Sequence, residues 1–488
     1  MTPQSDTRTH ARNFIGGAWT DSTTTTESIN PATGMALGTF ADGGVEEARA
    51  AIDAARAAFT TGDWARNREL RAHALFEMAD RLTERRDELV VLLSRENGKT
   101  LPEAGFEVDA SIPKLRYYAA VTLTESGRAA EVKPGLYSMT LKQPAGVAAV
   151  IAPWNSPVVL SIRSFAPALA AGCTVVMKLP GQTGLTNGLL YEIISSTTSL
   201  PAGVVNAFTE SGSAGARLVV SDPDVDVISF TGSTDTGRSI MANASATLKG
   251  MSLELGGKTP MIVFDDADLD AAVPVLTKAI TTFTGQFCMT GSRILVQRGI
   301  ADELRTRLSA ALEAVRVGPG DDPSSDMGPL IDRANADRVD RFVADAANYA
   351  KIVVRGGRIT TGPLAAGAFV RPSLVEVEGV DQPIVQQEVF GPVATFEIFD
   401  DEADAITRAN ATDYGLAASI WTCDVDRPLR VGREIDAGTI WTNTWAMIFD
   451  QMEEGGFKQS GVGRLHGIRA LEEFQEIKHY VHPSPRTI

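Results

Sequence analysis

Between about residues 146 and 264 the chain alternates short apolar, β-branched runs with helical stretches. The runs are Val147–Ala152, Thr174–Lys178, Val204–Phe208, Val225–Phe230 and Ser252–Leu255. This alternation predicts βαβ units, and therefore a parallel, doubly wound and Rossmann-like sheet with helices on both faces. In such sheets ligands bind beyond the carboxyl ends of the strands. We therefore expect functional residues in the turns that follow these runs.

A second α/β unit of similar size is expected from residue 258 to about 463. Its strands and helix are predicted at Arg293–Gln297, Ala301–Val315, Val393–Phe399, Ala417–Trp421 and Gly438–Thr442. Ahead of the first unit, the helical spacing of apolar residues predicts surface helices over 44–59 and 67–95. The threonine run Thr23–Thr26 indicates a turn or hairpin segment.

Residues 128–142 lie outside the βαβ rhythm and have the pattern of a hairpin. Polar and apolar residues alternate from Tyr137 to Lys142, after a turn at Lys133-Pro134-Gly135. Exposed strand edges are usually covered by a partner. We expect this hairpin to bridge to another subunit, and the alternative is an edge ribbon on its own domain.

Composition limits the partners. The 488 residues include 45 Lys and Arg against 61 Asp and Glu, a formal net charge of −16, which disfavours nucleic acid and anionic membranes. The three cysteines, Cys173, Cys288 and Cys423, have no metal-ligand spacing, so we expect neither a disulfide framework nor a metal site. No signal peptide or membrane span is expected, and a reducing cytoplasm fits best.

Three segments carry residues suited to one chemistry: Pro153-Trp154-Asn155, residues 253–258 and residues 285–293. Together they resemble the aldehyde dehydrogenase superfamily. The resemblance covers nearly the whole chain and continues through residues 174–183, 230–233, 328–330, 388–392 and 455–461. It implies an aldehyde dehydrogenase-like α/β fold with two doubly wound domains and a protruding oligomerisation hairpin.

The resemblance also implies a division of the chain. The dinucleotide-binding domain is expected to comprise residues 1–127 and 143–257, and the catalytic domain residues 258–463. Residues 128–142 and 464–488 are expected to form bridging segments in a homodimer or homotetramer.

Oxidation of an aldehyde by hydride transfer requires that a nucleophile first makes the carbonyl carbon tetrahedral. Cys288 matches the family nucleophile, whereas Cys173 and Cys423, on strand-like runs, are interpreted as small buried hydrophobes. The family pattern assigns the oxyanion donors to the Asn155 amide and the backbone N–H of Cys288, and such a donor lowers the barrier by about 3 kcal/mol. Glu254 is expected to be the general base that hydrolyses the thioester.

The resemblance implies NAD or NADP as the cofactor. The turn Thr231-Gly232-Ser233 opens a helix after a strand, where backbone N–H groups can meet a pyrophosphate. The GxGxxG fingerprint is absent, and residues 209–215 keep only a looser glycine loop. The expected cofactor residues are Ile151, Ala152, Pro153, Trp154, Lys178, Gly181, Gln182, Gly212, Gly215, Phe230, Thr231, Gly232, Ser233, Leu255, Gly256, Glu388 and Phe390.

The sequence departs from the family pattern in several places. Gly181 replaces a glutamate that binds the ribose hydroxyls of NAD and repels the phosphate of NADP, so the preference between the two is open. A common lysine is Ser164, and the tunnel tryptophan before it is Arg163. The acid that often follows the Gly-x-Gly-Arg segment is Leu465, so a proton relay through that position is excluded.

The common Pro-Phe pair before Gly455 is Glu453-Glu454. We expect Arg163 and Glu454 to pair across the substrate entrance, because both positions face the tunnel in the family. The residues expected to contact substrate are Arg163, Phe287, Met289, Trp445, Phe449 and Glu454.

The aromatic side chains favour an aromatic or medium-chain apolar aldehyde, although Trp445 and Phe449 are equally consistent with core packing. The acids at 453 and 454 indicate instead an amino- or trimethylammonio-aldehyde of the betaine type, or only a solvated rim. Two further alternatives are a coenzyme A-acylating semialdehyde dehydrogenase, which Glu254 disfavours, and a non-catalytic, cofactor-binding scaffold protein.

Overall fold

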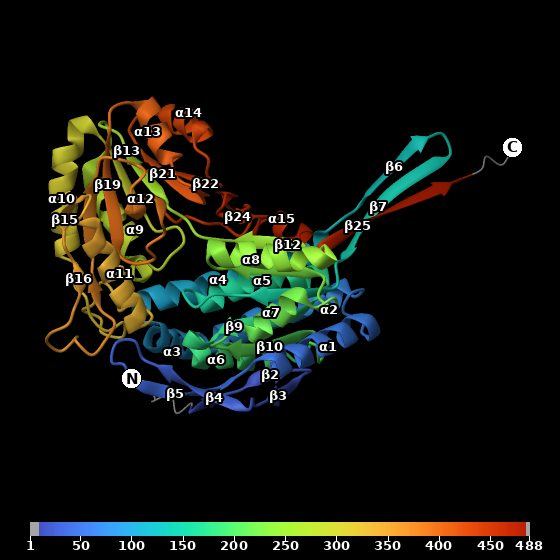
Figure 1. The fold of residues 1–488 in the computed structure, drawn as a ribbon. Coiled ribbons are helices and arrows are strands. Elements are labelled where there is room, and N and C mark those ends of the chain that lie inside the picture. Colours follow the sequence, from blue (N-terminus) through green and yellow to red (C-terminus); the bar gives the residue numbers. More distant parts are fainter. Residues whose placement is uncertain (1–8, 485–488) are drawn as a thin grey trace.

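The computed structural model describes residues 9–484, and Figure 1 shows two α/β bodies with a long ribbon that projects from one of them. The lower body is built on an eight-stranded sheet. Its strand order is β24 (Gly461–Val462), β12 (Gly250–Glu254), β11 (Val227–Thr231), β8 (Val147–Ile151), β9 (Thr174–Pro180), β10 (Val205–Glu210), β2 (Asn13–Ile15) and β3 (Ala18–Thr20). The central strands from β12 to β10 are parallel, as the sequence pattern predicts.

Helices cover both faces of this sheet, so alternate residues of its central strands point into different cores. On one face, Ala148 and Val150 of β8 pack with α2 (Arg68–Glu84), α3 (Arg86–Asn97), α4 (Leu101–Thr124), α5 (Pro157–Ala171) and α6 (Gly184–Ser195). On the other face, Val147 and Ala149 pack with α1 (Val45–Thr61), α7 (Ala214–Ser221) and α8 (Thr234–Ala244).

Helix α5 carries the segment that follows Asn155 and is buried on nearly all sides. Pro157 starts it, where proline's missing N–H is harmless, and Gly172 ends it in the left-handed conformation, with φ 103°. The predicted helix over 67–95 is instead two helices, because the backbone leaves the helix at Arg85. The Arg85 side chain pairs with Glu88 and Glu192, which holds this break.

The upper body contains a seven-stranded sheet. Its order is β15 (Lys351–Val354), β18 (Ser373–Val377), β19 (Val393–Phe399), β14 (Arg293–Gln297), β13 (Pro260–Val263), β21 (Ala417–Trp421) and β22 (Thr439–Thr442), and all neighbours except β15 and β18 are parallel. The accompanying helices are α9 (Leu269–Thr281), α10 (Ala301–Glu313), α11 (Arg333–Ala346), α12 (Pro383–Gln386), α13 (Glu402–Ala409) and α14 (Arg427–Glu434).

The threonine run lies in a hairpin, one of the two predicted alternatives: β4 (Thr24–Ile29) pairs antiparallel with β5 (Ala36–Asp42), which also pairs with β1 (His10–Ala11). Small two-stranded pairings join β16 (Gly357–Arg358) to β17 (Val370–Arg371), and β20 (Tyr414–Gly415) to β23 (Phe457–Lys458). Among the described residues, no helix combines the length and apolar character needed to cross a membrane.

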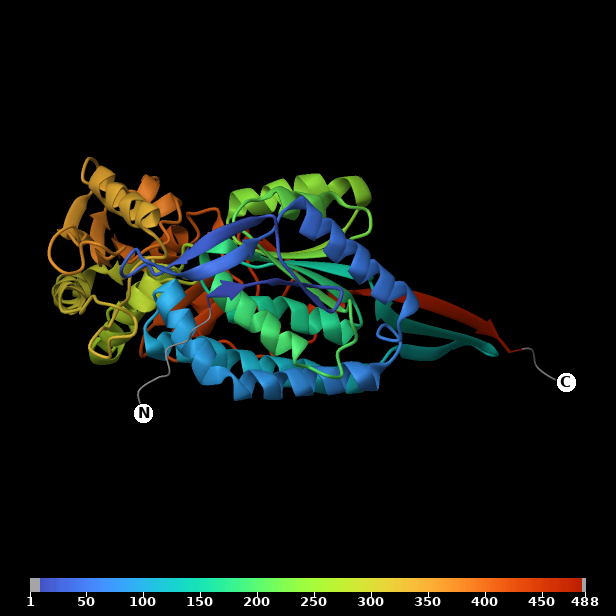
Figure 2. The same cartoon turned by 90° about the horizontal axis from the view of Figure 1, so that it is seen from below.

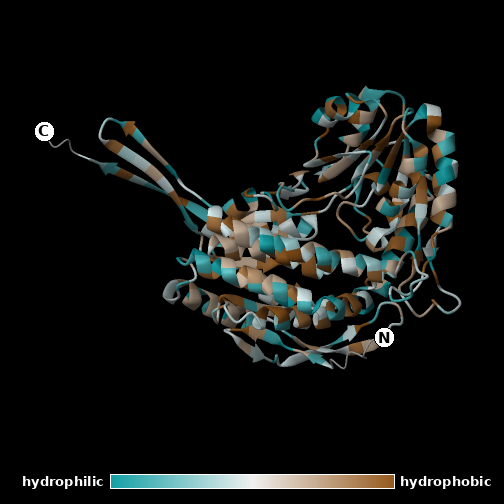
Figure 3. Ribbon diagram, turned by 180° about the vertical axis from the view of Figure 1, so that it is seen from behind, coloured by the Kyte–Doolittle hydropathy of each residue, from teal (hydrophilic) through white to brown (hydrophobic). Residues whose placement is uncertain are grey.

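The predicted hairpin is present and gains a third strand. Strands β6 (Arg128–Lys133) and β7 (Leu136–Pro144) form it, and β25 (Gln475–Pro483) pairs with β7 along its whole length. The ribbon extends away from both bodies (Figures 1 and 2). Hydrophobic and hydrophilic segments alternate along the ribbon (Figure 3). Its exposed apolar residues include Tyr137, Ile477 and Val481.

The chain crosses between the two bodies near its C-terminal end. Residues 443–460 leave the second sheet, and β24 then pairs with β12 of the first sheet, with Glu254 opposite Gly461. Helix α15 (Arg469–Glu472) follows and packs on α5. This return brings residues 453–466 against the end of β12.

Candidate active site

The loop that carries Cys288 is held in an unusual backbone conformation. Phe283, Thr284 and Gly285 all have positive φ, at 53°, 56° and 69°. A Cβ at Gly285 would lie 2.2 Å from the backbone of Gly391, so only glycine fits there. The backbone N–H of Phe283 donates to Glu103 at 2.7 Å, and the Thr284 hydroxyl to the Gly328 carbonyl at 3.0 Å. These bonds position Cys288, which is partly exposed.

Asn155 lies between β8 and α5, and its amide points at the cysteine loop. Nδ2 donates to the carbonyl of Gln286 at 3.0 Å, and because a side-chain amide has two N–H donors, the second is left for another acceptor. The Asn155 side chain is buried, so a hydrogen bond from it to a developing oxyanion would be poorly screened.

Sequence reasoning missed the residues that hold Asn155 in place. Lys99 and Glu107 form a fully buried ion pair. The ammonium of Lys99 also donates to Ser156 at 2.9 Å, and Glu107 accepts from the backbone N–H of Val158 at 2.9 Å. Lys99 and Glu107 lie far from Asn155 in the sequence, so no local sequence pattern indicates that they support it.

Glu254 is the last residue of β12 and is almost completely buried, at 3% exposure. Burial raises the pKa of its carboxyl to about 8; Arg163 opposes this rise and Glu454 adds to it. Its Oε1 has no hydrogen-bond partner in the described chain. A Cβ at Gly257 would lie 2.3 Å from the Cys288 carbonyl, which shows how closely the segment after Glu254 approaches the cysteine loop.

The thiol of Cys288 is protonated at neutral pH in this state. Burial raises its pKa, and the Glu454 carboxylate raises it further, while Arg163 lowers it. The nucleophile therefore needs a nearby base or an added positive charge to become a thiolate. Of the other two cysteines, Cys173 is buried as expected, but Cys423 lies beyond the end of β21 and is exposed, so its interpretation as a buried hydrophobe was wrong.

The candidate cofactor residues converge at the carboxyl ends of β8, β9, β11 and β12. Ile151 ends β8 and Ala152 follows it, while Phe230 and Thr231 end β11 and pair with Leu253 and Glu254 of β12. Ser233 caps α8 by accepting from the Thr236 N–H at 3.3 Å, so the first turn of α8 faces this edge. The arrangement matches the expected place for a pyrophosphate at a helix N-terminus.

The glycine loop of residues 209–215 does not have the environment that we expected. The carboxylate of Glu210 accepts from the backbone N–H groups of Gly215 and Ala216, at 2.8 and 3.1 Å. The negative charge at this helix start opposes a phosphate. The N–H of Gly215 is therefore bound to Glu210, whereas Gly212 is exposed, and the role of both glycines in binding a cofactor stays a prediction.

The side chains expected near an adenosine ribose lie at the end of β9. Lys178 is partly buried, and desolvation lowers the pKa of its ammonium although Glu210 and Asp42 are near. Gly181 is buried and Gln182 exposed. A Cβ at Gly181 would lie 2.2 Å from the Ser211 hydroxyl, so Ser211 occupies the space that a side chain at position 181 needs.

Glu388 and Phe390 come from the other body and reach the same edge. The Glu388 carboxylate accepts from the Gly257 N–H at 3.1 Å, and burial raises its pKa to about 7. The ring of Phe390 meets Trp154 edge to face, with centroids 5.5 Å apart. The predicted residues Trp154, Glu388 and Phe390 therefore lie close together, and Glu388 lies next to Gly256.

The predicted ion pair between Arg163 and Glu454 is confirmed, with Nη1 and Oε1 3.5 Å apart. Both side chains are buried, at 5% and 6% exposure, so Glu454 is not part of a solvated rim. Arg163 also donates to the Thr231 hydroxyl at 2.9 Å. Glu453, in contrast, is exposed, and its carboxylate accepts from the Arg469 N–H at 3.3 Å.

Aromatic side chains surround Cys288. Phe287 lies edge to face with Trp445, with centroids 5.8 Å apart, and with Phe283 at 5.6 Å. Met289 is fully buried in a cluster with Leu416, Ala417 and Trp441, so its side chain lies in the core and not in a substrate pocket as expected. Phe449 is 54% exposed and lines a pocket of about 460 Å³ that Glu454 also lines.

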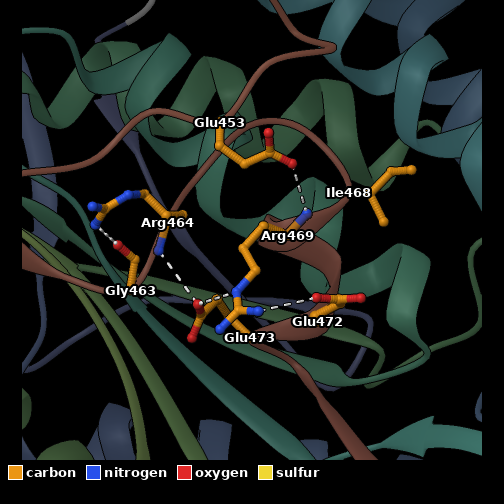
Figure 4. Close-up of a pocket in the computed structure, with 7 residues that line it drawn as sticks. All are labelled: Glu453, Gly463, Arg464, Ile468, Arg469, Glu472 and Glu473. Atoms are coloured by element: carbon orange, nitrogen blue, oxygen red, sulfur yellow. Dashed lines mark hydrogen bonds and ion pairs between the residues drawn. The ribbon is translucent and has the colours of Figure 1, made fainter. Parts of the chain in front are cut away.

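A separate groove of about 570 Å³ lies on the other side of Glu453 (Figure 4). It is lined by Glu453, Gly463, Arg464, Ile468, Arg469, Glu472 and Glu473. In this groove Arg469 pairs with both Glu472 and Glu473, and the backbone N–H of Arg464 donates to Glu473. Within residues 9–484, no group of three or more His, Cys, Asp or Glu side chains is arranged to hold a metal ion.

The fold and the site together define a two-domain dehydrogenase with a cysteine nucleophile. The sequence model of the aldehyde dehydrogenase family matches residues 19–480, and the chain belongs to this family. It is an NAD(P)-dependent aldehyde dehydrogenase, an oxidoreductase that oxidises aldehydes.

Solved structures of a betaine aldehyde dehydrogenase from Staphylococcus aureus are similar over almost the whole chain. A complex of that enzyme with NAD+ is 36% identical, with a TM-score of 0.95, over 98% of this chain and 95% of that chain. A structure of an apo point variant is 35% identical, with a TM-score of 0.95, over 99% and 97% of the two chains.

Proposed function

We propose that this enzyme oxidises an aldehyde to a free carboxylic acid through a covalent intermediate on Cys288. The observation that carries the proposal is the convergence of Cys288, the Asn155 amide and the buried Glu254 at the junction of the two bodies. Attack by sulfur forms a thiohemiacetal, whose oxyanion accepts hydrogen bonds from the Asn155 amide and the Cys288 N–H.

NAD(P)+ supplies a hydride acceptor when bound. The residues that would hold it are the first turn of α8 for the pyrophosphate, Lys178 for the adenosine ribose, and Glu388 with Phe390 for the nicotinamide end. The donor set fits the group, because amides at a helix start, an ammonium and a carboxylate suit a phosphate and ribose hydroxyls. Gly181 removes the negative charge that would repel NADP, which supports use of both nicotinamides.

Glu254 acts in the second half of the reaction. Once hydride has left the thiohemiacetal, Cys288 carries a thioester, and Glu254 takes a proton from the water that attacks it. A pKa of about 8 means that the active, ionised form of Glu254 grows as the pH rises from 7 to 9. This carboxylate supports hydrolysis rather than transfer to coenzyme A.

For the substrate we propose a neutral aromatic or medium-chain aldehyde. Phe287 and Trp445 offer aromatic faces beside Cys288. A trimethylammonio-aldehyde, suggested by the likeness to betaine aldehyde dehydrogenase, can contact aromatic faces and is stabilised further by a nearby net negative charge. Glu454 does not supply one, because it is paired with the cation of Arg163.

A substrate panel tests this proposal. We expect kcat/KM for benzaldehyde or octanal to exceed that for betaine aldehyde by on the order of tenfold or more, because Phe287 and Trp445 can bury an apolar substrate, whereas the paired Arg163 and Glu454 offer a quaternary ammonium no net negative charge. The measurement is the near-ultraviolet absorbance of the reduced nicotinamide, with NAD+ and NADP+ in parallel and without coenzyme A. A preference for betaine aldehyde would establish the second candidate. Turnover that requires coenzyme A would establish the acylating one, and no turnover with any aldehyde would favour a cofactor-binding scaffold.

We also propose that the chain works as a homodimer or homotetramer in the cytoplasm, divided as the resemblance implies into residues 1–127 with 143–257, residues 258–463, and bridging segments 128–142 and 464–488. The ribbon of β6, β7 and β25 supports this, because its apolar residues lack cover within the described chain. Light scattering should give a mass two or four times 51.9 kDa. A Tyr137→Asp, Ile477→Asp variant should shift to smaller species, and a monomeric wild type would contradict the proposal.

A further inference from the structure

The chain lacks a carboxylate at position 465 but has one directly opposite that position. Glu454 and Leu465 form an isolated antiparallel bridge, and each backbone N–H donates to the other's carbonyl at 2.8 Å. Residues that face each other in this way project their side chains to the same side, with Cα atoms about 5.5 Å apart. Glu454 therefore places a carboxylate near the place where a side chain at 465 would have placed one.

Glu454 lies in a buried cluster of polar groups whose hydrogen bonding is incomplete. Glu254 Oε1, Arg163 Nε, Glu454 Oε2 and His466 Nδ1 are all buried and have no hydrogen-bond partner in the described chain. Glu454 Oε2 and His466 Nδ1 are 3.6 Å apart, slightly too far for a direct hydrogen bond. Buried polar groups at such separations are commonly joined by ordered water.

The backbone at His466 supports a functional role for this cluster. His466 has φ 60°, in the left-handed region that non-glycine residues seldom occupy, and its side chain is almost completely buried. Strained residues of this kind persist where the surrounding structure holds them, often at active sites. His466 is neutral at pH 7, because burial, Lys114 and Arg163 all lower its pKa.

The cluster connects Glu254 to solvent. Glu454 contacts the Arg163 guanidinium, and both are close enough to Glu254 to alter its pKa. On its other side Glu454 lines the pocket of about 460 Å³, together with the exposed Phe449 and Met452. A proton that reaches Glu454 can therefore leave through this pocket.

We propose that Glu454 carries away the proton that Glu254 receives in each hydrolysis. This inference rests on the proposed function of Glu254. The attacking water loses a proton to Glu254 as its oxygen bonds to the thioester carbon and the carbon–sulfur bond breaks. The proton then passes through water held by Arg163 to Glu454, and from there to the pocket. His466 is a positioning residue that orients Glu454.

Glu473 is the competing route. Its carboxylate also affects the pKa of Glu254, and it lies at the groove shown in Figure 4. However, Glu473 already accepts from the Arg464 N–H at 3.3 Å and lies 3.7 Å from Arg469. Glu454, with a buried and unpartnered oxygen, is the better acceptor.

Pre-steady-state kinetics of Glu454→Gln tests the relay, with the best aldehyde of the panel. We expect an unchanged rate for the first turnover, a burst of about one reduced nicotinamide per site, and then a kcat at pH 7 lower by on the order of tenfold or more, because proton removal limits hydrolysis. Imidazole or formate should restore kcat as its concentration rises. Glu476→Gln, at an exposed position of β25 that does not line this pocket, should behave as the wild type.

The pH profile separates a relay from a purely electrostatic effect. The charged groups that act on Glu254 are Arg163, Glu454, Arg464 and Glu473. Removal of the Glu454 charge should move the midpoint of the kcat profile below about 8, because Glu454 raises that pKa and Arg163 lowers it. An electrostatic role alone would then increase kcat at pH 7, since more Glu254 is ionised, whereas loss of the relay decreases it.

Several results would overturn the relay. These are a kcat at pH 7 that is unchanged or increased in Glu454→Gln, a slower first turnover in that variant, or a larger loss of kcat in Glu473→Gln. The double variant Leu465→Glu, Glu454→Gln should recover part of the rate, because it places a carboxylate on the residue that is paired with position 454. Glu254→Gln should arrest as the acyl-enzyme, with kcat lower by about 10²-fold or more. If Glu254→Gln instead turns over normally, the proposed function itself fails.

Discussion

Replacement of Cys288 by alanine is expected to lower kcat by on the order of 10⁴-fold or more, because no covalent intermediate can form without the sulfur. The Asn155 amide binds the loop that carries Cys288, and the segment after Glu254 approaches the same loop. The measurement is the formation of reduced nicotinamide with the best aldehyde of the panel, at pH 8, over hours.

The same variant should still fold and bind cofactor. Alanine fills most of the space of cysteine, so the thermal midpoint and the quenching of protein fluorescence by NAD+ should match the wild type. Cys423→Ala is the matched control, because Cys423 is exposed and lies just beyond the end of β21. Turnover of Cys288→Ala within about tenfold of the wild type would refute the covalent mechanism.

Glu397→Gln is expected to destabilise the enzyme by about 3–5 kcal/mol, because it leaves a buried guanidinium without its counter-charge. Glu397 on β19 and Arg293 on β14 form a two-bonded pair at 2.8 and 2.6 Å, and both side chains are completely buried. Arg293 also donates to the Arg408 carbonyl at 2.8 Å. Because a carbonyl is a neutral acceptor, Glu397 supplies the negative charge in this arrangement. Urea unfolding monitored by tryptophan fluorescence measures the loss.

The pair also gives a pH dependence with a defined sign. Burial raises the pKa of Glu397, but Arg293 and the Thr395 hydroxyl more than offset this and hold it below its usual range. Its contribution to stability is therefore full above pH about 4.3, the unfolded value, and is lost as the pH falls through the lower folded value. The difference between wild type and Glu397→Gln should shrink only in acid.

Two controls make this prediction specific. Asp400→Asn removes one partner of the exposed Arg298–Asp400 pair, and should leave the unfolding midpoint unchanged. The double variant Arg293→Met, Glu397→Leu removes both buried charges and should recover most of the lost stability. A Glu397→Gln variant as stable as the wild type would contradict the prediction that loss of the Arg293 counter-charge lowers the free energy of unfolding.

The proposed catalytic residues lie in short motifs that can be recognised in the local sequence. Cys288, Asn155 and Glu254 each lie in a short motif with its own backbone requirement: a glycine-punctuated loop, a strand-to-helix turn and a strand end. These requirements are local, so the motifs were recognisable without the fold. The same holds for β14, β19 and β21, whose bounds match the prediction, because buried parallel strands are short apolar runs.

One prediction failed where distant contacts decide the outcome. Met289 was expected beside substrate, but its side chain is fully buried in a cluster with Leu416, Ala417 and Trp441. The sequence around Met289 is compatible with either role, and residues more than 100 positions away place the side chain in the core. The glycine loop of residues 209–215 stays a predicted phosphate site, in which Glu210 binds the N–H groups of Gly215 and Ala216.

The sequence by itself predicted the parallel strands and the hairpin, because these depend on local periodicity, and its resemblance to the aldehyde dehydrogenase family supplied the class of fold and the three residues proposed for catalysis. Only the tertiary structure showed that β24 pairs with β12 and so brings Glu454 and His466 to Glu254. It also revealed the supporting pair of Lys99 and Glu107. The physical reason is that burial and charge act through space, so the pKa of Glu254 depends on side chains up to 219 positions away in the chain.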